Sequence, residues 1–150
     1  MQTSKTLRLF LLLCGFIATA IGAAITFIPA QFHAGHGFDL AGNANLASEV
    51  RASGAALMTL GLMITSGAFV ARLATAATAL TAAVYSSYGA ARLVSLAVDG
   101  APDSGLLQAM GLELLIGAVA LLALARRLRA PGGQGRVSPV QSPEAVSPAS

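Results

Sequence analysis

The sequence predicts an all-α, integral-membrane protein that folds as an antiparallel four-helix bundle. Of its 150 residues, 55% are hydrophobic and 10% are charged, whereas a soluble domain usually has about 25% charged residues. There is no Trp, and the long apolar runs are rich in Ala and Leu, which favours helices over the alternating strands of a membrane barrel. Because backbone groups find no water inside a bilayer, helices that satisfy them internally are the simplest spanning structure.

The first apolar stretch, about 7–28, is long enough to span a bilayer, which needs about 20 residues. The apolar core of a cleavable signal peptide is typically shorter, at about 7–15 residues. We therefore expect a retained helix, ended by Pro29. The single cysteine, Cys14, lies inside this stretch and is expected to pack as a small hydrophobic residue.

The segment PAQFHAGHGFDLAGNAN follows the first helix and is rich in Gly and Asn, which predicts a loop. Asn45 is a good N-cap residue. We expect it to begin the second helix, about 45–70.

A short basic connection at Arg72 leads to the third helix, about 73–98. The sequence DGAPDS then combines Asp-Gly, Pro and Ser, which are strong turn signals. We expect Ser104 to cap the fourth helix, about 105–128.

The composition changes after residue 129. The remaining segment, 130–150, has no apolar periodicity and contains Ser-Pro pairs at Ser138, Ser142 and Ser147. We expect a disordered, Pro/Ser-rich cytoplasmic tail there, and one transmembrane domain over residues 1–129.

Basic residues indicate the orientation. With an even number of spans, both termini and the connection between the second and third helices lie on one side of the membrane. That side carries seven basic residues, which are Lys5, Arg8, Arg72, Arg126, Arg127, Arg129 and Arg136. Since basic residues accumulate on the cytoplasmic side, we expect a multi-pass protein of the bacterial inner membrane with both termini in the cytoplasm. Anionic lipid headgroups suit this basic rim, and no nucleic-acid partner is implied.

Polar residues gather in the helix halves nearest the opposite side. They recur at three- and four-residue spacing, so that each set lies on one helical face. The two sets are Asn45, Glu49 and Ser53 on the second helix, and Tyr88, Arg92, Ser95 and Asp99 on the third.

Arg92 and Glu113 form the predicted ion pair. At a rise of about 1.5 Å per residue, each lies roughly 10–13 Å from the turn between their helices, so the two reach similar depths. We expect Glu49 to face Arg92 as well. Arg51 points about 200° away from Glu49 and needs another partner, which is a loop carboxylate, a lipid phosphate or Asp99. Pairing lowers the cost of a charge at the bilayer centre, at least about 2.5–3.5 kcal/mol.

Small residues predict close packing of the helices, because in lipid they let two backbones approach. The packing residues are Gly15, Thr19, Gly22 and Thr26 on the first helix, and Gly117 and Ala120 on the fourth.

His33, His36 and Asp39 have an H-x-x-H-x-x-D spacing in the first loop. A Gly-rich loop does not preorganise three ligands, so we predict a solvated loop, no metal site and no cofactor. The sequence has no GxxxxGKS loop, CxxC pair, HExxH helix or GxSxG elbow, and therefore no local sign of nucleotide, zinc or serine hydrolysis.

The segments NLASEVRASG, ARLVSLAVDGAP and ELLIGA, in this order, resemble a bacterial family of small four-helix membrane proteins, the domain of unknown function 4345, which is similar to the DoxX-like superfamily. The resemblance covers about 7–128 and implies a four-helix membrane fold without a reaction. Relatives in the wider superfamily include quinone-linked oxidoreductase subunits and sterol-isomerase-like proteins, but a shared fold does not transfer their activity. The matching positions are Asn45, Ser48, Glu49, Arg51, Gly54, Arg92, Ser95, Asp99, Gly100 and Glu113.

Three functions stay open. In the one we favour, the outward polar cluster binds a membrane lipid or another small amphipathic molecule. In the second, the protein is a small membrane enzyme in which Glu49, Asp99 or Glu113 carries out acid–base chemistry on a hydrophobic substrate. In the third, the cluster fixes helix register, and the chain is a structural subunit of a membrane complex or a homo-oligomer.

Overall fold

The computed structural model describes residues 4–34, 40 and 42–129. The described residues form helices and no strand, so the predicted all-α class is confirmed. Four long helices lie over the four ranges expected from the sequence: α1 (Lys5–Phe27), α3 (Ala44–Phe69), α4 (Ala74–Asp99) and α5 (Ser104–Arg129). Two short elements connect them: α2 (Pro29–Ala34) and the 3-10 helix η1 (Ala71–Leu73). The expected tail, residues 130–150, lies outside the described residues.

Three of the long helices, α1, α3 and α5, are long and apolar enough to cross a membrane. The equally long α4 is not among them, because its Thr, Ser and Tyr residues and Arg92 lower its mean hydropathy. The sequence analysis predicted four spans from the composition and from the length of the apolar stretches. By hydropathy, three of the four meet that prediction.

The segment that follows α1 begins with a helix, where the sequence predicted a loop. Proline is favoured at the first position of a helix, because its missing N–H needs no partner there, and Pro29 begins α2 in this way. The Nδ1 atom of His33 lies 2.9 Å from the carbonyl oxygen of Pro29. The other two residues of the histidine pattern, His36 and Asp39, lie outside the described part of the chain.

The helix caps differ from the predicted ones by one or two residues. Asn43, not Asn45, caps α3: its side-chain oxygen accepts a hydrogen bond at 3.0 Å from the backbone N–H three residues later. Asp103, not Ser104, precedes α5, and its Oδ1 accepts from two backbone N–H groups at 2.8 and 3.1 Å. In both places the sequence offers two good N-cap residues close together, and the helix begins after the earlier one.

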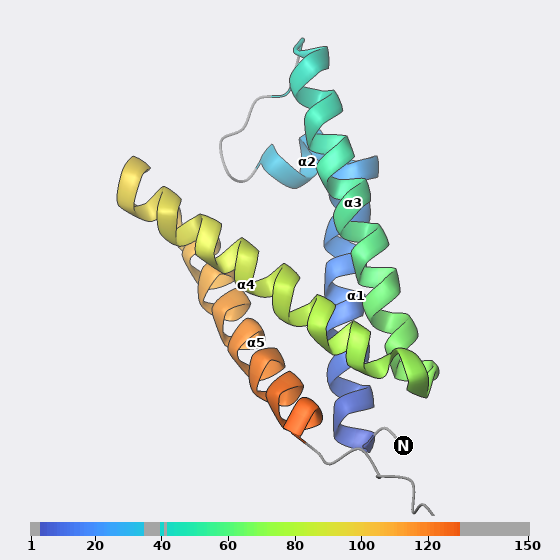
Figure 1. Cartoon of the computed structure of the whole chain (residues 1–150). Coiled ribbons are helices and arrows are strands. Elements are labelled where there is room, and N and C mark those ends of the chain that lie inside the picture. The colour runs from blue at the N-terminus through green and yellow to red at the C-terminus, as the bar shows by residue number, and fades with distance from the viewer. Residues whose placement is uncertain (1–3, 35–39, 41, 130–150) are drawn as a thin grey trace, which may run out of the picture.

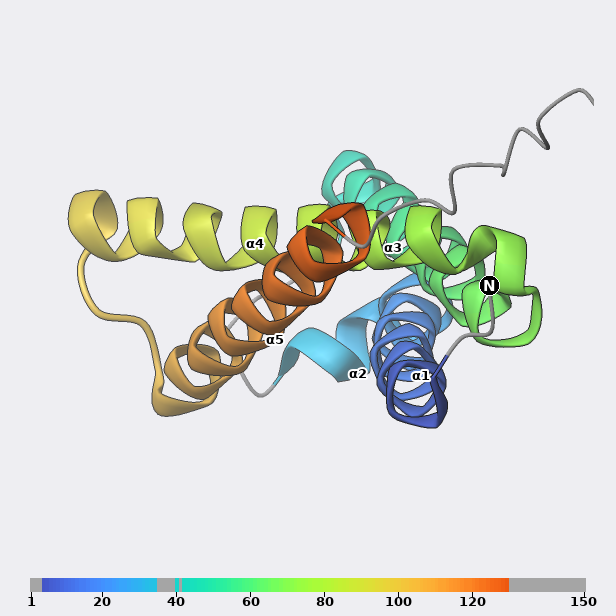
Figure 2. The ribbon, with the colours of Figure 1, turned by 60° about the horizontal axis from the view of Figure 1, so that its bottom comes forward.

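The long helices form two antiparallel hairpins. α1 packs along α3 and α4 packs along α5, whereas the hairpins touch each other mainly through a shorter contact between α3 and α4 (Figure 1). From the region where they meet, the hairpins diverge, and Figures 1 and 2 both show the start of α3 far from the end of α4. The predicted four-helix bundle is therefore not confirmed along the full length of the helices.

Glycine and threonine bring α1 and α3 very close together. A Cβ atom added to Gly61 of α3 would lie 2.5 Å from the backbone nitrogen of Thr19, and one added to Gly15 of α1 would lie 2.8 Å from the carbonyl oxygen of Gly61. The hydroxyl groups of Thr19 and Thr26 each donate at 2.7 Å to the carbonyl four residues earlier, so they bring no unsatisfied donor into the contact. The packing face predicted on the first helix is confirmed.

The hairpin of α4 and α5 is also packed through glycines. A Cβ atom on Gly117 would lie 2.6 Å from the hydroxyl oxygen of Ser86, and one on Gly89 would lie 2.7 Å from the side chain of Leu114. Ala120 is fully buried. Gly117 and Ala120 therefore pack as predicted.

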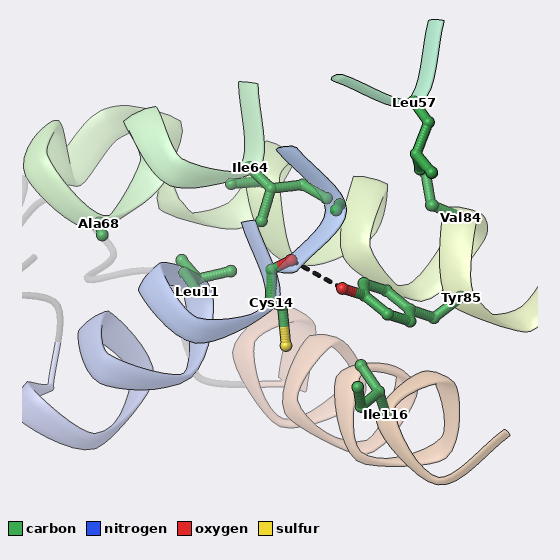
Figure 3. Close-up of a cluster of buried hydrophobic side chains, with 10 residues drawn as sticks. Leu11, Cys14, Leu57, Ile64, Ala68, Val84, Tyr85 and Ile116 are labelled. Atoms are coloured by element: carbon green, nitrogen blue, oxygen red, sulfur yellow. Dashed lines mark hydrogen bonds between the residues drawn. The ribbon is translucent and has the colours of Figure 1, made fainter. Parts of the chain in front are cut away.

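A small apolar core lies where the hairpins meet (Figure 3). Every long helix contributes to it: the buried residues are Leu11, Cys14, Ala18, Leu57, Ile64, Ala68, Ala77, Val84, Tyr85 and Ile116. Within it, the hydroxyl of Tyr85 on α4 donates to the backbone carbonyl of Cys14 on α1 at 2.7 Å. Cys14 is buried among these residues, as expected for a small hydrophobic side chain.

We predict opposite effects of alanine at two helical glycines. In Gly22→Ala, the new methyl group would meet the backbone of Met58 and the carbonyl oxygen of Gly54, and such overpacking costs about 1–3 kcal/mol. In the control Gly111→Ala, nothing lies within 4 Å of the new group, so alanine's better helix propensity, worth about 1 kcal/mol, should dominate. Thermal unfolding in detergent, followed by circular dichroism, should show a lower Tm for the first variant only. An unchanged Tm for Gly22→Ala would contradict the close contact.

Candidate functional site

Charged residues are separated between the two ends of the molecule. The end where α1 begins, α3 passes into α4 and α5 ends is called the basic end here. Its residues are Lys5, Arg8, Arg72, Arg126, Arg127 and Arg129. All carboxylates of the described residues lie toward the opposite, acidic end, on helix halves or in the turn between α4 and α5. They are Glu49, Asp99, Asp103 and Glu113.

The predicted ion pair between Arg92 on α4 and Glu113 on α5 is confirmed. The Nε atom of Arg92 donates to Oε2 of Glu113 at 2.8 Å, and the two side chains are 31% and 15% exposed. A guanidinium has five N–H donors in a planar fork, and only the Nε–H has a partner here. Within the described part of the chain, the four Nη–H donors of Arg92 therefore have no protein acceptor.

The face of α4 that carries Arg92 is fully buried nearer the basic end. An α-helix has 3.6 residues per turn, so positions 18 residues apart have the same direction. Arg92 is thus in phase with Ala74, and Asp99 with Thr81. Ala74 and Thr81 are both completely buried, whereas Asp99 is exposed.

The other members of this face, Tyr88 and Ser95, lie in the same half of α4. Tyr88 is 38% exposed. Ser95 is exposed, and its hydroxyl donates to Oδ2 of Asp99 at 2.8 Å. This polar face of α4, comprising Tyr88, Arg92, Ser95 and Asp99, therefore continues a packing surface that is partly uncovered near the acidic end, where α5 contacts it at Arg92 through Glu113.

The polar face of α3 behaves in the same way. Glu49 is in phase with Gly67, 18 residues later, and a Cβ on Gly67 would collide with Ala77 of α4. Glu49 is exposed and makes no hydrogen bond or ion pair with another described residue. Ser53 donates to the carbonyl of Val50 on its own helix, at 2.8 Å.

Glu49 thus faces the side of α4, but it does not approach Arg92 as the sequence analysis expected. The divergence of the hairpins separates them, because the start of α3 and the end of α4 lie apart. Asn45, one turn before Glu49, is also exposed. The structure therefore brings together the polar residues of α4 and α5, but not those of α3.

Arg51 has a different role from those expected for it. Its Nη1 donates at 2.9 Å to the carbonyl oxygen of Thr26, in the last turn of α1, where carbonyl groups lack a partner within the helix. It binds neither Asp99 nor a loop carboxylate among the described residues. At the other end of the hairpin, the Nε of Arg8 donates at 2.9 Å to the carbonyl of Ala68, in the last turn of α3.

These reciprocal arginine caps were not predicted as contacts. In an antiparallel hairpin, a basic residue in the first two turns of one helix lies beside the C-terminus of its neighbour, where a positive charge is favourable. The positions of Arg8 and Arg51 near two helix starts were the available signal. Arg127 makes a different interhelical contact: near the end of α5, its Nε donates at 3.1 Å to the hydroxyl oxygen Oγ1 of Thr75, at the start of α4.

Two other features lie apart from the polar faces. Among the described residues, no group of three or more His, Cys, Asp and Glu side chains is arranged to hold a metal ion. A shallow surface hollow of about 290 Å³ lies at the start of α3, and the residues that line it are Leu40, Gly42, Asn43, Ala44 and Ala47. None of these side chains is charged, so the hollow offers little to orient a ligand.

Residues 6–124 match the family described as "Domain of unknown function (DUF4345)". The match covers all four long helices except Lys5 at the start of α1 and the last residues of α5. No curated protein and no solved structure matches the chain.

We predict that Arg92 and Glu113 are energetically coupled. Glu113→Gln leaves a partly buried guanidinium without its carboxylate, and Arg92→Gln does the reverse, so each single variant should have a lower Tm. The double variant should lose less than the two changes added together, with a coupling of about 0.5–3 kcal/mol. Unfolding of the four proteins in one detergent measures this directly. Simple additivity would show that the pair contributes nothing to folding.

Proposed function

The chain belongs to the DUF4345 family, and we propose that it is a multi-pass membrane protein that binds a lipid-like or small amphipathic molecule between the diverging ends of its two hairpins. The proposal has two parts, an orientation in the membrane and a binding surface. The first rests on charge and hydropathy, the second on the uncovered polar faces of α3 and α4.

The charge distribution supports cytoplasmic termini. Three of the long helices have the length and apolar character of membrane spans. The basic end has six described basic residues and no described carboxylate, and basic residues accumulate on the cytoplasmic side of a membrane. With α4 as the remaining span, the acidic end faces outward.

One observation carries the binding surface. The face of α4 that is completely buried at Ala74 and Thr81 continues outward as an exposed polar face. In a membrane, unpaired polar groups cost several kcal/mol each, so the free donors of Arg92 need a partner. An amphipathic molecule supplies one, because its polar group meets the guanidinium while its apolar part covers an exposed apolar side chain such as Leu93.

A structural role for the polar residues is the second candidate. It is favoured by the Arg92–Glu113 pair, because this pair lies within one hairpin and fixes the register of α4 and α5. A purely structural network predicts a loss of stability on substitution with no change in bound molecules. The two candidates therefore differ in what copurifies with the protein.

We expect the wild-type chain, purified in mild detergent, to retain a lipid or another small amphipathic molecule that mass spectrometry identifies. Tyr88→Ala should reduce the retained amount several-fold, because it removes a hydroxyl and a ring from the polar face of α4. Val94→Ala is the matched control. Val94 is 62% exposed and points about 200° away from Arg92, so its truncation should leave retention unchanged.

Two outcomes of this experiment would count against binding. If wild-type protein retains nothing beyond detergent, the surface has no ligand. If Tyr88→Ala and Val94→Ala lower retention equally, the retained molecule covers the outside of the helices as ordinary annular lipid does.

We also expect single cysteines to report the orientation. Ala101→Cys, in the exposed turn between α4 and α5, should react with a membrane-impermeant maleimide in intact spheroplasts. Ala71→Cys, in exposed η1, should react only after the membrane is disrupted. The native Cys14 is buried and serves as the unlabelled background. The reverse pattern would invert the topology.

A further inference from the structure

The polar face of α4 carries a fixed order of charges. From the centre of the helix toward its end, the order is Tyr88, the Arg92 guanidinium, Ser95 and the Asp99 carboxylate. Because Ser95 donates to Asp99 at 2.8 Å, the carboxylate is held back toward Ser95, which is about 4.5 Å of helix rise from Arg92. A positive group therefore lies deeper along the helix, and a negative group lies a turn closer to its end.

The groups that have no protein partner on this surface are complementary to a dipolar ligand. The hydroxyl of Tyr88 and the four Nη–H groups of Arg92 are donors without an acceptor among the described residues. Asp99 lies closer to the end of α4, and its hydrogen bond from Ser95 is exposed. The carboxylate of Glu49 belongs to the other hairpin, on α3. The donors would bind an anionic group, and the carboxylates would bind a cationic group closer to the water.

A lipid with a net negative headgroup fits this surface less well. The described residues of the acidic end include four carboxylates, on Glu49, Asp99, Asp103 and Glu113, and two guanidinium groups, on Arg51 and Arg92. The Nη1 of Arg51 is engaged by a helix carbonyl, and the Nε of Arg92 by Glu113. The field at this end is therefore negative, and it disfavours an anion that has no positive charge of its own.

We propose that the ligand of the polar face of α4 is a zwitterionic phospholipid with a primary ammonium, that is, an aminoethyl phosphate headgroup. This inference rests on the proposed function. The phosphate accepts hydrogen bonds from Arg92 and Tyr88, and the ammonium donates to Asp99. The acyl chains run toward the basic end along the apolar helix surfaces. In a bilayer the phosphate of such a lipid lies deeper than its ammonium, which is the order of the charges along α4.

Three lipids with identical acyl chains test the headgroup: phosphatidylethanolamine, phosphatidylcholine and phosphatidylglycerol. The full chain, stripped of lipid in detergent, is mixed with each lipid, and bound lipid is counted by native mass spectrometry. The quaternary ammonium of the choline lipid cannot donate a hydrogen bond, and the glycerol lipid has no cation. We expect the ethanolamine lipid to bind about fivefold more tightly than either, which corresponds to about 1 kcal/mol for one hydrogen-bonded ion pair.

Asp99→Asn removes the carboxylate but keeps an oxygen acceptor for Ser95. It should reduce the affinity for the ethanolamine lipid to that for the choline lipid, while the latter is unchanged. Asp103→Asn is the matched control, because it removes the same charge from the same end and asparagine is an equally good N-cap. This control should keep the fivefold preference.

The outcomes separate the inference from the proposed function. Equal or tighter binding of the glycerol or choline lipid by the wild-type chain overturns the headgroup assignment and leaves a lipid-binding surface. Failure to bind any of the three overturns the headgroup assignment, and the proposed function falls with it if the protein as purified also retains no amphipathic molecule. An ethanolamine preference that survives in Asp99→Asn overturns the role of Asp99.

Discussion

The close contact between α1 and α3 is the constraint on which the rest of this structure depends. Glycine at positions 15, 22, 54 and 61 lets the two backbones touch, and in lipid, where the hydrophobic effect gives no force between helices, such contact is a main source of association. The antiparallel register then places Arg51 beside the end of α1 and Arg8 beside the end of α3. Two charges that would be costly in a bilayer thereby become caps of helix carbonyls.

The interhelical hydrogen bonds of the arginine side chains stay within one hairpin. In the described residues, side-chain hydrogen bonds between helices join α1 with α3 through Arg8 and Arg51, and α4 with α5 through Arg92 and Arg127. One such bond, from Tyr85 to Cys14, crosses between the hairpins. The hairpins can therefore diverge without breaking an ion pair, and the small apolar core around Tyr85 holds them together.

The sequence predicted what depends on one helix or on neighbouring helices. Periodicity identified the faces that carry Gly22 and Arg92, and equal depth in adjacent antiparallel helices identified the partner of Arg92. The sequence analysis missed α2, because Pro29 was interpreted only as the end of the first helix. It also chose Asn45 and Ser104 as caps, where in each case a cap residue one or two positions earlier is used. Hydropathy, weighed more strictly, would have distinguished α4 from the other three long helices.

The sequence could not predict the angle between the hairpins. That angle explains why Glu49 has no hydrogen-bond partner among the described residues, whereas Arg51 has one. The phase of a helix fixes the direction of a side chain, but not how far away the next helix lies. The direction predicted for Glu49 agrees with the structure, since it shares the phase of Gly67, which touches α4. Arg92 does not lie beside Glu49, because α3 and α4 have already diverged at the level of Glu49. Arg51 points to the side of α3 that packs against α1. There, backbone contact at the glycines keeps the two helices close, so Arg51 reaches the carbonyl of Thr26. In this fold, polar residues on the α1–α3 contact bind helix carbonyls, and those on the continuation of the α3–α4 contact remain partly exposed where the hairpins diverge.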